Sequence, residues 1–199
     1  MKTGSFMALA ASMTVAASAF GLNLGDKAPS TTVKMKNVDG SEVSIADVAG
    51  KGGTLVIFSC NHCPFVKAWQ DRIAAIGNAA KTKGVGVIVI NSNDPASYPE
   101  DSFTEMQARA KQLGFTFPYV VDATSDVARS FDATRTPEAF LFDKDGKLVY
   151  HGAIDDSQKA DQVSKHFLQD AVDAVTSGKD VPVKETKFVG CGIKYRAKT

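Results

Sequence analysis

The hydrophobic pattern changes its period along the chain and predicts alternating strands and helices. Residues 55–58, in an expected strand at 54–59, and residues 85–90 form two apolar runs that are rich in β-branched side chains, as expected of strands buried on both faces. Between them, apolar residues recur at helical spacing from Pro64 to Lys83, and Gly84 marks the end of that segment. A strand, a helix and a second buried strand in this order indicate an α/β protein.

Shorter patterned segments flank this unit on both sides. Asp39-Gly40 is a turn dipeptide between two strand-like segments and favours an N-terminal β-hairpin. Ser102 and Glu105 have the spacing of a capping box and predict a helix that extends to about Leu113. The other expected elements are a helical turn at 45–48, a strand at 119–121, a helix at 124–131, strands at 139–142 and 147–151 around a turn at 143–146, and a last helix at 158–176 capped by Ser157.

The first nineteen residues have the pattern of an export signal. Lys2 is followed by the apolar, alanine-rich stretch from Phe6 to Val15, and Ala17-Ser18-Ala19 has the small-x-small form of a cleavage site. The apolar run is shorter than the ~20 residues that a membrane-spanning helix needs. We therefore expect cleavage after Ala19 and a periplasmic or secreted protein, with one domain at 20–178 and a C-terminal tail at 179–199.

Charge and composition narrow the range of partners. The chain has 23 basic and 22 acidic residues, and removal of the signal, which contains only Lys2 among the charged residues, leaves the two signs equal. This balance gives no reason to expect a nucleic acid or an anionic membrane surface as partner. A hydrophobic content of 44% with 23% charged residues is typical of a globular domain. No cofactor is expected.

The strongest chemical signal is Cys60-Asn61-His62-Cys63-Pro64, which lies between the first buried strand and the long helix. A thiol at a helix start is acidified by the unpaired N–H groups there, and a second thiol two residues away can release a mixed disulfide. We expect Cys60 to be the more exposed and more acidic thiol. A zinc half-site, a static disulfide and two buried thiols remain alternatives, although a structural zinc site would need more ligands. His62 either stabilises the thiolate or is an exposed loop residue.

The third cysteine, Cys191, stands in the tail between Gly190 and Gly192. An odd number of cysteines leaves at least one thiol free or exchanging. Cys191 is therefore either a resolving thiol for the Cys60–Cys63 pair or a buried spare thiol.

Several strings of this sequence resemble the alkyl hydroperoxide reductase/thiol-specific antioxidant (redoxin) family, and in particular a peroxiredoxin-like branch of it. These strings include Gly25-Asp26-Lys27-Ala28-Pro29, Cys60 to Val66, Ile90-Asn91-Ser92-Asn93-Asp94 and Tyr98-Pro99-Glu100-Asp101-Ser102. The resemblance implies a thioredoxin-like fold, with a central mixed sheet and helices on both faces, and thiol-based chemistry. It also implies that Thr136-Pro137 contains a cis proline that faces the cysteine pair, with the backbone of Thr136 free to pair with a substrate.

Two departures from the family pattern bear on the reaction. Peroxidases of this family place a Thr or Ser three residues before the attacking cysteine, and here Ile57 and Cys60 occupy the two corresponding positions. Arg135 stands where relatives often carry a further cysteine, and it is either a cation near the dithiol or a surface arginine. Tyr98, Glu100 and Asp101 either line a pocket or form a solvated loop.

The sequence thus favours an exported thiol–disulfide oxidoreductase that acts on protein or small-molecule disulfides and thiols. In this hypothesis Cys60 attacks and Cys63 resolves the mixed disulfide. One alternative is a thiol peroxidase that acts on peroxides. The other is a Cu(I) carrier that uses Cys60 and Cys63 together with His62 or His151.

Overall fold

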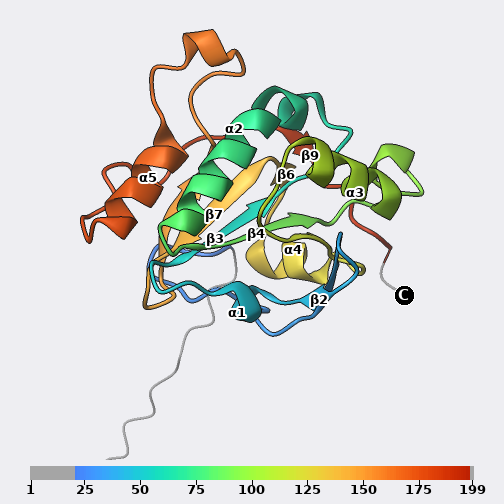
Figure 1. Cartoon of the computed structure of the whole chain (residues 1–199), viewed down its shortest axis with the longest axis horizontal. Coiled ribbons are helices and arrows are strands. Elements are labelled where there is room, and N and C mark those ends of the chain that lie inside the picture. Colours follow the sequence, from blue (N-terminus) through green and yellow to red (C-terminus); the bar gives the residue numbers. More distant parts are fainter. Residues whose placement is uncertain (1–20, 198–199) are drawn as a thin grey trace, which may run out of the picture.

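A computed structural model describes residues 21–197 and shows a seven-stranded mixed sheet at the centre of the chain (Figure 1). The strands lie in the order β2 (Glu42–Val43), β1 (Met35–Asn37), β5 (Tyr119–Val121), β4 (Gly86–Asn91), β3 (Thr54–Phe58), β7 (Glu138–Phe142) and β8 (Leu148–Gly152). β3, β4 and β5 run parallel to one another, whereas β1 and β7 join this unit antiparallel. The expected N-terminal hairpin and mixed sheet are confirmed.

Helices cover both faces of the sheet and enclose two hydrophobic cores. α2 (Pro64–Thr82), α3 (Phe103–Gln112) and α5 (Phe167–Thr176) pack on one face, whereas α1 (Ile45–Val48) and α4 (Asp126–Phe131) pack on the other. β3 lies between the two cores, and all five of its side chains are buried. A strand buried on both faces must be apolar throughout, which explains the continuous run that the sequence shows. The cysteine pair follows directly at its carboxyl end.

The last helix is shorter than its sequence pattern predicted. It begins at Phe167, and residues 157–166 form a loop that contains only the 3₁₀ turn η2 (Ala160–Gln162). The carboxylate of Asp156 accepts hydrogen bonds from the backbone N–H groups of Ser164 and Lys165 and so closes this loop. Such side-chain bonds to the backbone compete with helix formation, and they explain why the expected cap at Ser157 is wrong.

The expected capping box at Ser102 is also wrong. Ser102 does precede α3, but its side chain makes no cap hydrogen bond. Its backbone N–H, which Glu105 would have to bind, already donates to the carbonyl of Pro99 in the 3₁₀ helix η1 (Pro99–Asp101). A capping box does form at α1, where Ser44 and Asp47 bond reciprocally.

The C-terminal tail returns across the sheet and is anchored on both sides of Cys191. Before it, the N–H of Thr186 donates to the carbonyl of His151. At the cysteine itself, β9 (Cys191–Gly192) pairs antiparallel with β6 (Arg135–Thr136). The tail is therefore anchored at Thr186 and again at the cysteine.

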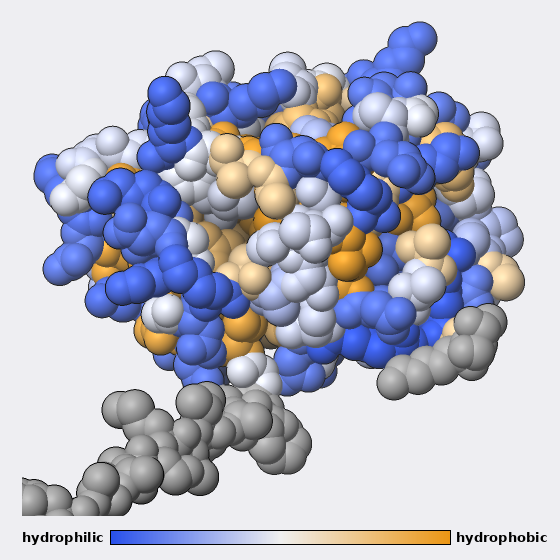
Figure 2. All heavy atoms as spheres, turned by 90° about the horizontal axis from the view of Figure 1, so that it is seen from below, coloured by the Kyte–Doolittle hydropathy of each residue, from blue (hydrophilic) through white to orange (hydrophobic). Residues whose placement is uncertain are grey.

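The outside of the molecule is mixed in character. Figure 2 shows hydrophilic side chains interrupted by smaller hydrophobic areas, on the side where α1 lies in Figure 1. Among residues 21–197, no helix is long and apolar enough to cross a membrane. The expected export signal at residues 1–19 lies outside the described residues.

Candidate active site

The cysteine pair occupies the corner between β3 and α2. β3 ends at Phe58, and Pro64 is the first residue of α2. Cys63 is the N-cap of that helix, so Cys63, and not Cys60, stands at the helix start. Both side chains are buried, with Cys60 2% exposed and Cys63 fully enclosed. The expected strand–cysteine–helix arrangement is confirmed, but neither thiol of the pair is exposed in this state.

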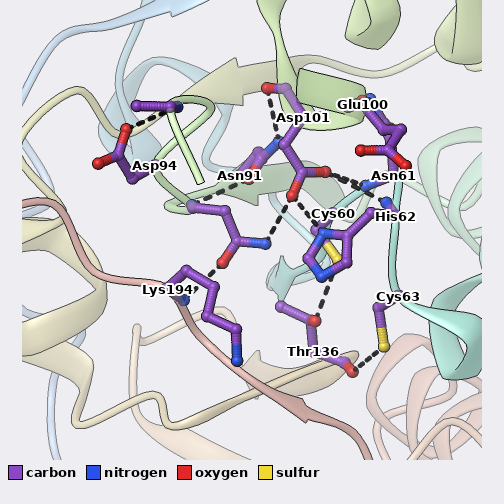
Figure 3. Close-up of polar contacts among 12 residues, drawn as sticks. Cys60, Asn61, His62, Cys63, Asn91, Asp94, Glu100, Asp101, Thr136 and Lys194 are labelled. Carbon is purple, nitrogen blue, oxygen red and sulfur yellow. Dashed lines mark hydrogen bonds and ion pairs between the residues drawn. The ribbon is translucent and has the colours of Figure 1, made fainter. Parts of the chain in front are cut away.

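Thr136 contacts both thiols. Its hydroxyl lies 3.2 Å from the sulfur of Cys60, and its carbonyl oxygen lies 3.4 Å from the sulfur of Cys63 (Figure 3). The Thr136–Pro137 peptide bond is cis, as the family resemblance implied. The expectation that the backbone of Thr136 is free to pair with a substrate is wrong, because Thr136 pairs with Cys191 in the β6–β9 ladder. The sequence also missed the hydroxyl of Thr136, which supplies a hydrogen-bonding group that the positions before the cysteines lack.

The two thiols differ in acidity in the direction opposite to the one expected. The thiol of Cys60 donates a hydrogen bond to Cys63, and this bond is the main reason why the pKa of Cys63 falls to about 4. The thiol of Cys191 and the backbone N–H groups of Val66 and Cys191 also favour the Cys63 thiolate. The pKa of Cys60 is raised well above its usual value by the same bond to Cys63, by burial and by the negative charge of Asp101. The expectation that Cys60 is the more acidic thiol is therefore wrong.

A buried carboxylate holds the loop between the two cysteines. Asp101 accepts hydrogen bonds from the backbone N–H of Asn61 at 2.6 Å and from the side-chain amide of Asn93 at 2.8 Å (Figure 3). Its other close partner is the ring nitrogen Nδ1 of His62, at 2.5 Å. The solvated-loop interpretation of Asp101 is thus wrong, because its side chain is fully buried. A usable signal existed: Asp101 follows β4, whose carboxyl end lies beside that of β3 in a parallel pair.

His62 is fixed on two sides. Its ring stacks on that of Tyr98 with the centroids 3.9 Å apart, and Nδ1 faces Asp101. The side chain is 11% exposed, so the exposed-loop interpretation of His62 does not hold. The ammonium group of Lys194, from the tail, lies 5.8 Å from the centre of the Tyr98 ring.

Cys191 lies beside the pair, on the side of Cys63. It is the residue opposite Thr136 in the β6–β9 ladder, and it packs against the cluster formed by Cys60, Cys63 and Val66. Burial, the hydrogen bond to Cys63 and the charge of Cys63 raise the pKa of Cys191 to about 11. The structure therefore brings all three cysteines of the sequence together.

The side chain of Arg135 contacts the C-terminal tail. Its side chain is a hydrogen-bond donor to the carbonyl of Gly190 at 2.9 Å, and its charge moderates the raised pKa of Cys191. Arg135 is exposed, as the surface interpretation expected, and its charge acts on Cys191.

Within the part of the chain that the structure describes, one group of side chains has the potential to bind a metal ion. Ligand atoms of Cys60, His62 and Asp101 lie within 4.8 Å of one another. The Asp101 oxygens, however, are already taken by the hydrogen bonds described above, and His151, the other histidine considered for copper, is bound to Glu138 at 2.8 Å. Of the two histidines proposed for copper, His62 belongs to this group and His151 does not.

Little space surrounds the pair. The pocket that borders Cys60 has a volume of about 10 Å³, which is about the minimum that one water molecule requires. A larger groove of about 280 Å³ runs past Pro137 and the tail residue Val189, and none of the three cysteines lines it. A substrate therefore has no direct path to Cys60 in this state.

The fold and this site match a known family. The Redoxin family model matches residues 23–166, and the chain belongs to that family. Among curated proteins, it is similar to the thiol-disulfide oxidoreductase ResA of Bacillus cereus, with 25% identity over 132 residues that cover 64% of this chain and 68% of the relative. It is also similar to ResA of Geobacillus thermodenitrificans, with 25% identity that covers 57% of this chain and 61% of the relative.

Solved structures give the same picture. An uncharacterized conserved protein from Geobacillus kaustophilus superimposes with a TM-score of 0.83 at 40% identity, covering 89% of this chain and 95% of that one. A hypothetical protein from Sinorhizobium meliloti 1021 gives a TM-score of 0.82 at 34% identity over 90% of this chain and 98% of that one. The thioredoxin domain of a thiol-disulfide oxidoreductase from Bacteroides vulgatus covers 66% and 89%, with a TM-score of 0.54 at 23% identity. The expected thioredoxin-like fold is confirmed.

Proposed function

We propose that this protein is a thiol–disulfide oxidoreductase that cycles between a Cys60–Cys63 dithiol and disulfide. The observation that carries the proposal is the placement of both thiols against Thr136 at the end of a buried strand, with Cys63 capping the following helix. The similarity to two proteins named thiol-disulfide oxidoreductase supports it.

The proposed order of attack is the reverse of the one favoured by the sequence. Cys63, whose pKa is about 4, is the thiolate at neutral pH and attacks the substrate disulfide. The substrate's first sulfur leaves as a thiolate and takes up a proton. Cys60 then attacks the sulfur of Cys63, forms the Cys60–Cys63 disulfide and releases the second substrate thiol. The proton of Cys60 is lost in this second step.

The proposal is tested by reducing a model protein disulfide, such as insulin, with the reduced protein. We expect stoichiometric reduction of insulin by the wild type, none by Cys63→Ser, and a trapped mixed disulfide on Cys63 in the double variant Cys60→Ser/Cys191→Ser, which lacks both neighbouring thiols. A trapped mixed disulfide on Cys60 in the Cys63→Ser variant, together with none in Cys60→Ser/Cys191→Ser, would contradict the proposed order. Protein alkylated at all three thiols is the blank.

A thiol peroxidase is a second candidate because the hydroxyl of Thr136 lies 3.2 Å from the sulfur of Cys60. The ratio of two rates separates the candidates: oxidation of the reduced protein by hydrogen peroxide, and oxidation by a model disulfide. A faster reaction with peroxide, with sulfenic acid as the first product, would favour the peroxidase. Tight one-to-one Cu(I) binding without disulfide reduction would instead favour the copper carrier.

The place of action that we propose is the periplasm or the outside of the cell. The proposal rests on the pattern of residues 1–19, and a disulfide-exchanging protein suits an oxidising compartment. Mass spectrometry of the protein purified from a cell-envelope fraction should find a chain that begins at Phe20. A chain retained in the cytoplasm with residues 1–19 intact would contradict export.

A further inference from the structure

Of the three cysteines in the sequence, Cys191 is the most exposed to solvent. Cys60 and Cys63 are buried, whereas Cys191 is partly exposed. The pocket beside Cys60 has a volume of only about 10 Å³. A reagent dissolved in water therefore meets the sulfur of Cys191 first, as long as the tail keeps its place.

The C-terminal tail holds Cys191 in a defined position. In the β6–β9 ladder Cys191 is paired with Thr136, whose carbonyl oxygen lies 3.4 Å from the sulfur of Cys63. Gly190 permits this approach, because a Cβ atom there would come within 2.4 Å of the Thr136 carbonyl oxygen. The N–H of Ile193 donates to the carbonyl of Thr134 and continues the pairing past the cysteine.

The same strand occupies the edge that an incoming polypeptide would need. β9 takes the backbone edge of β6 at Thr136, so an extended peptide substrate has no free strand edge there. A small thiol does not need that edge, since it has only to reach the sulfur of Cys191.

From this arrangement we infer that Cys191 is a third redox-active cysteine, through which a small thiol reduces the buried Cys60–Cys63 disulfide. The inference rests on the proposed function and names the reductant class for its site. In the first step Cys191 loses its proton and attacks the sulfur of Cys63, forms a Cys63–Cys191 disulfide and releases Cys60, which takes up the proton.

Two further exchanges complete the cycle. A small thiolate attacks the partly exposed sulfur of Cys191 and releases Cys63 as a thiolate; a second one attacks the resulting mixed disulfide and frees Cys191. In sum, two small thiols become one small disulfide, and the Cys60–Cys63 disulfide becomes a dithiol. The low pKa of Cys63 makes it a good leaving group in the middle step.

The intermediate is trapped by removing one thiol at a time. Cys60→Ser treated with oxidised glutathione should form an intramolecular Cys63–Cys191 disulfide, seen by peptide mapping under non-reducing conditions. Cys63→Ser is the matched control, because the structure places Cys191 beside Cys63: it should stop at a glutathione adduct on Cys191. Glutathione adducts or dimers without a Cys63–Cys191 bond in Cys60→Ser would overturn the inference, as would an equally ready Cys60–Cys191 bond in the control.

A kinetic measurement on protein that keeps both Cys60 and Cys63 gives an independent test. Reduction of the oxidised protein by glutathione should be at least about tenfold slower in Cys191→Ser than in wild type, because access governs exchange rates. Equal rates would overturn the inference even if the trapping variant failed to fold. If the wild type itself forms no Cys60–Cys63 disulfide, the proposed function fails; if it forms one and Cys191→Ser is reduced equally fast, only the role of Cys191 fails.

Discussion

At the residue scale, the central feature is that the protonated thiol of Cys60 stabilises the thiolate of Cys63. Cys60 donates to Cys63, and the Cys63 thiolate is also favoured by the thiol of Cys191 and by the backbone N–H groups of Val66 and Cys191. The sequence predicted one acidified cysteine at this corner, which is correct. It did not predict which cysteine, because the choice depends on the residue at which the helix begins and on Asp101, which approaches from another part of the chain.

The acidity of Cys63 can be measured directly. Thiolate absorbance at 240 nm in the reduced protein should titrate with a pKa of about 4, well below the usual value of about 8.5. The Cys60→Ala variant should raise this pKa, because it removes the hydrogen bond that lowers it most. Unchanged titration in that variant would show that the hydrogen bond from Cys60 does not acidify Cys63.

We expect Asp101 both to stabilise the fold and to raise the pKa of Cys60. Asp101→Asn replaces an acceptor of several hydrogen bonds with a group that is partly a donor, and the mismatch should lower the free energy of unfolding by about 1–3 kcal/mol. It should also lower the pKa of Cys60, because the negative charge that raises it is gone. Chemical denaturation measures the first effect. Glu100→Gln is the matched control, since that neighbouring side chain is exposed and should change stability by less than about 0.5 kcal/mol.

At the element scale, the sequence predicted the parts of the fold that one local pattern determines. β3 and β4 follow from apolar runs, and α2 follows from helical spacing that ends before Gly84. The start of α5 was missed because the bonds of Asp156 favour a loop over a helix. β9 was missed because two residues between glycines carry no strand signal, and only the tertiary contact with β6 makes them a strand.

The tail strand offers a matched pair of glycine substitutions. Gly190→Ala would place a Cβ atom 2.4 Å from the Thr136 carbonyl oxygen and should push β9 away from β6. Gly192→Ala is the control, because its nearest neighbour would be 3.9 Å away. We expect alkylation of Cys63 to become severalfold faster in Gly190→Ala and to stay near the wild-type rate in Gly192→Ala. Equal rates in both variants would show that β9 does not shield Cys63.

At the scale of the whole molecule, the charge on Cys63 couples the redox state to stability. The folded-state pKa of about 4 lies below the unfolded value of about 8.5, so the reduced native state binds fewer protons than the unfolded chain between these limits. Its stability therefore rises with pH across this window and is lost as the pH falls through about 4. The oxidised protein lacks this thiolate.

Thermal unfolding of both redox states checks this coupling. The melting temperature of the reduced protein, relative to that of the oxidised protein, should be higher at pH 7.5 than at pH 5. The comparison between redox states removes the contribution of other titrating groups that the two states share. A difference that is independent of pH, or that changes in the opposite direction, would show that Cys63 is not ionised in the folded reduced protein.

Stabilisation of the reduced state also sets the direction of the reaction. A thiolate held at low pKa makes the corresponding disulfide more oxidising, so the reduction potential should lie above the about −270 mV of thioredoxin. Equilibration with glutathione buffers of known ratio, followed by acid quenching and peptide mapping, measures this potential and identifies the bonded cysteines together. The account predicts a single two-electron transition between the Cys60–Cys63 dithiol and disulfide at a potential above about −270 mV. Buffers that leave both thiols free at every ratio, or that yield only adducts and no Cys60–Cys63 bond, would contradict it.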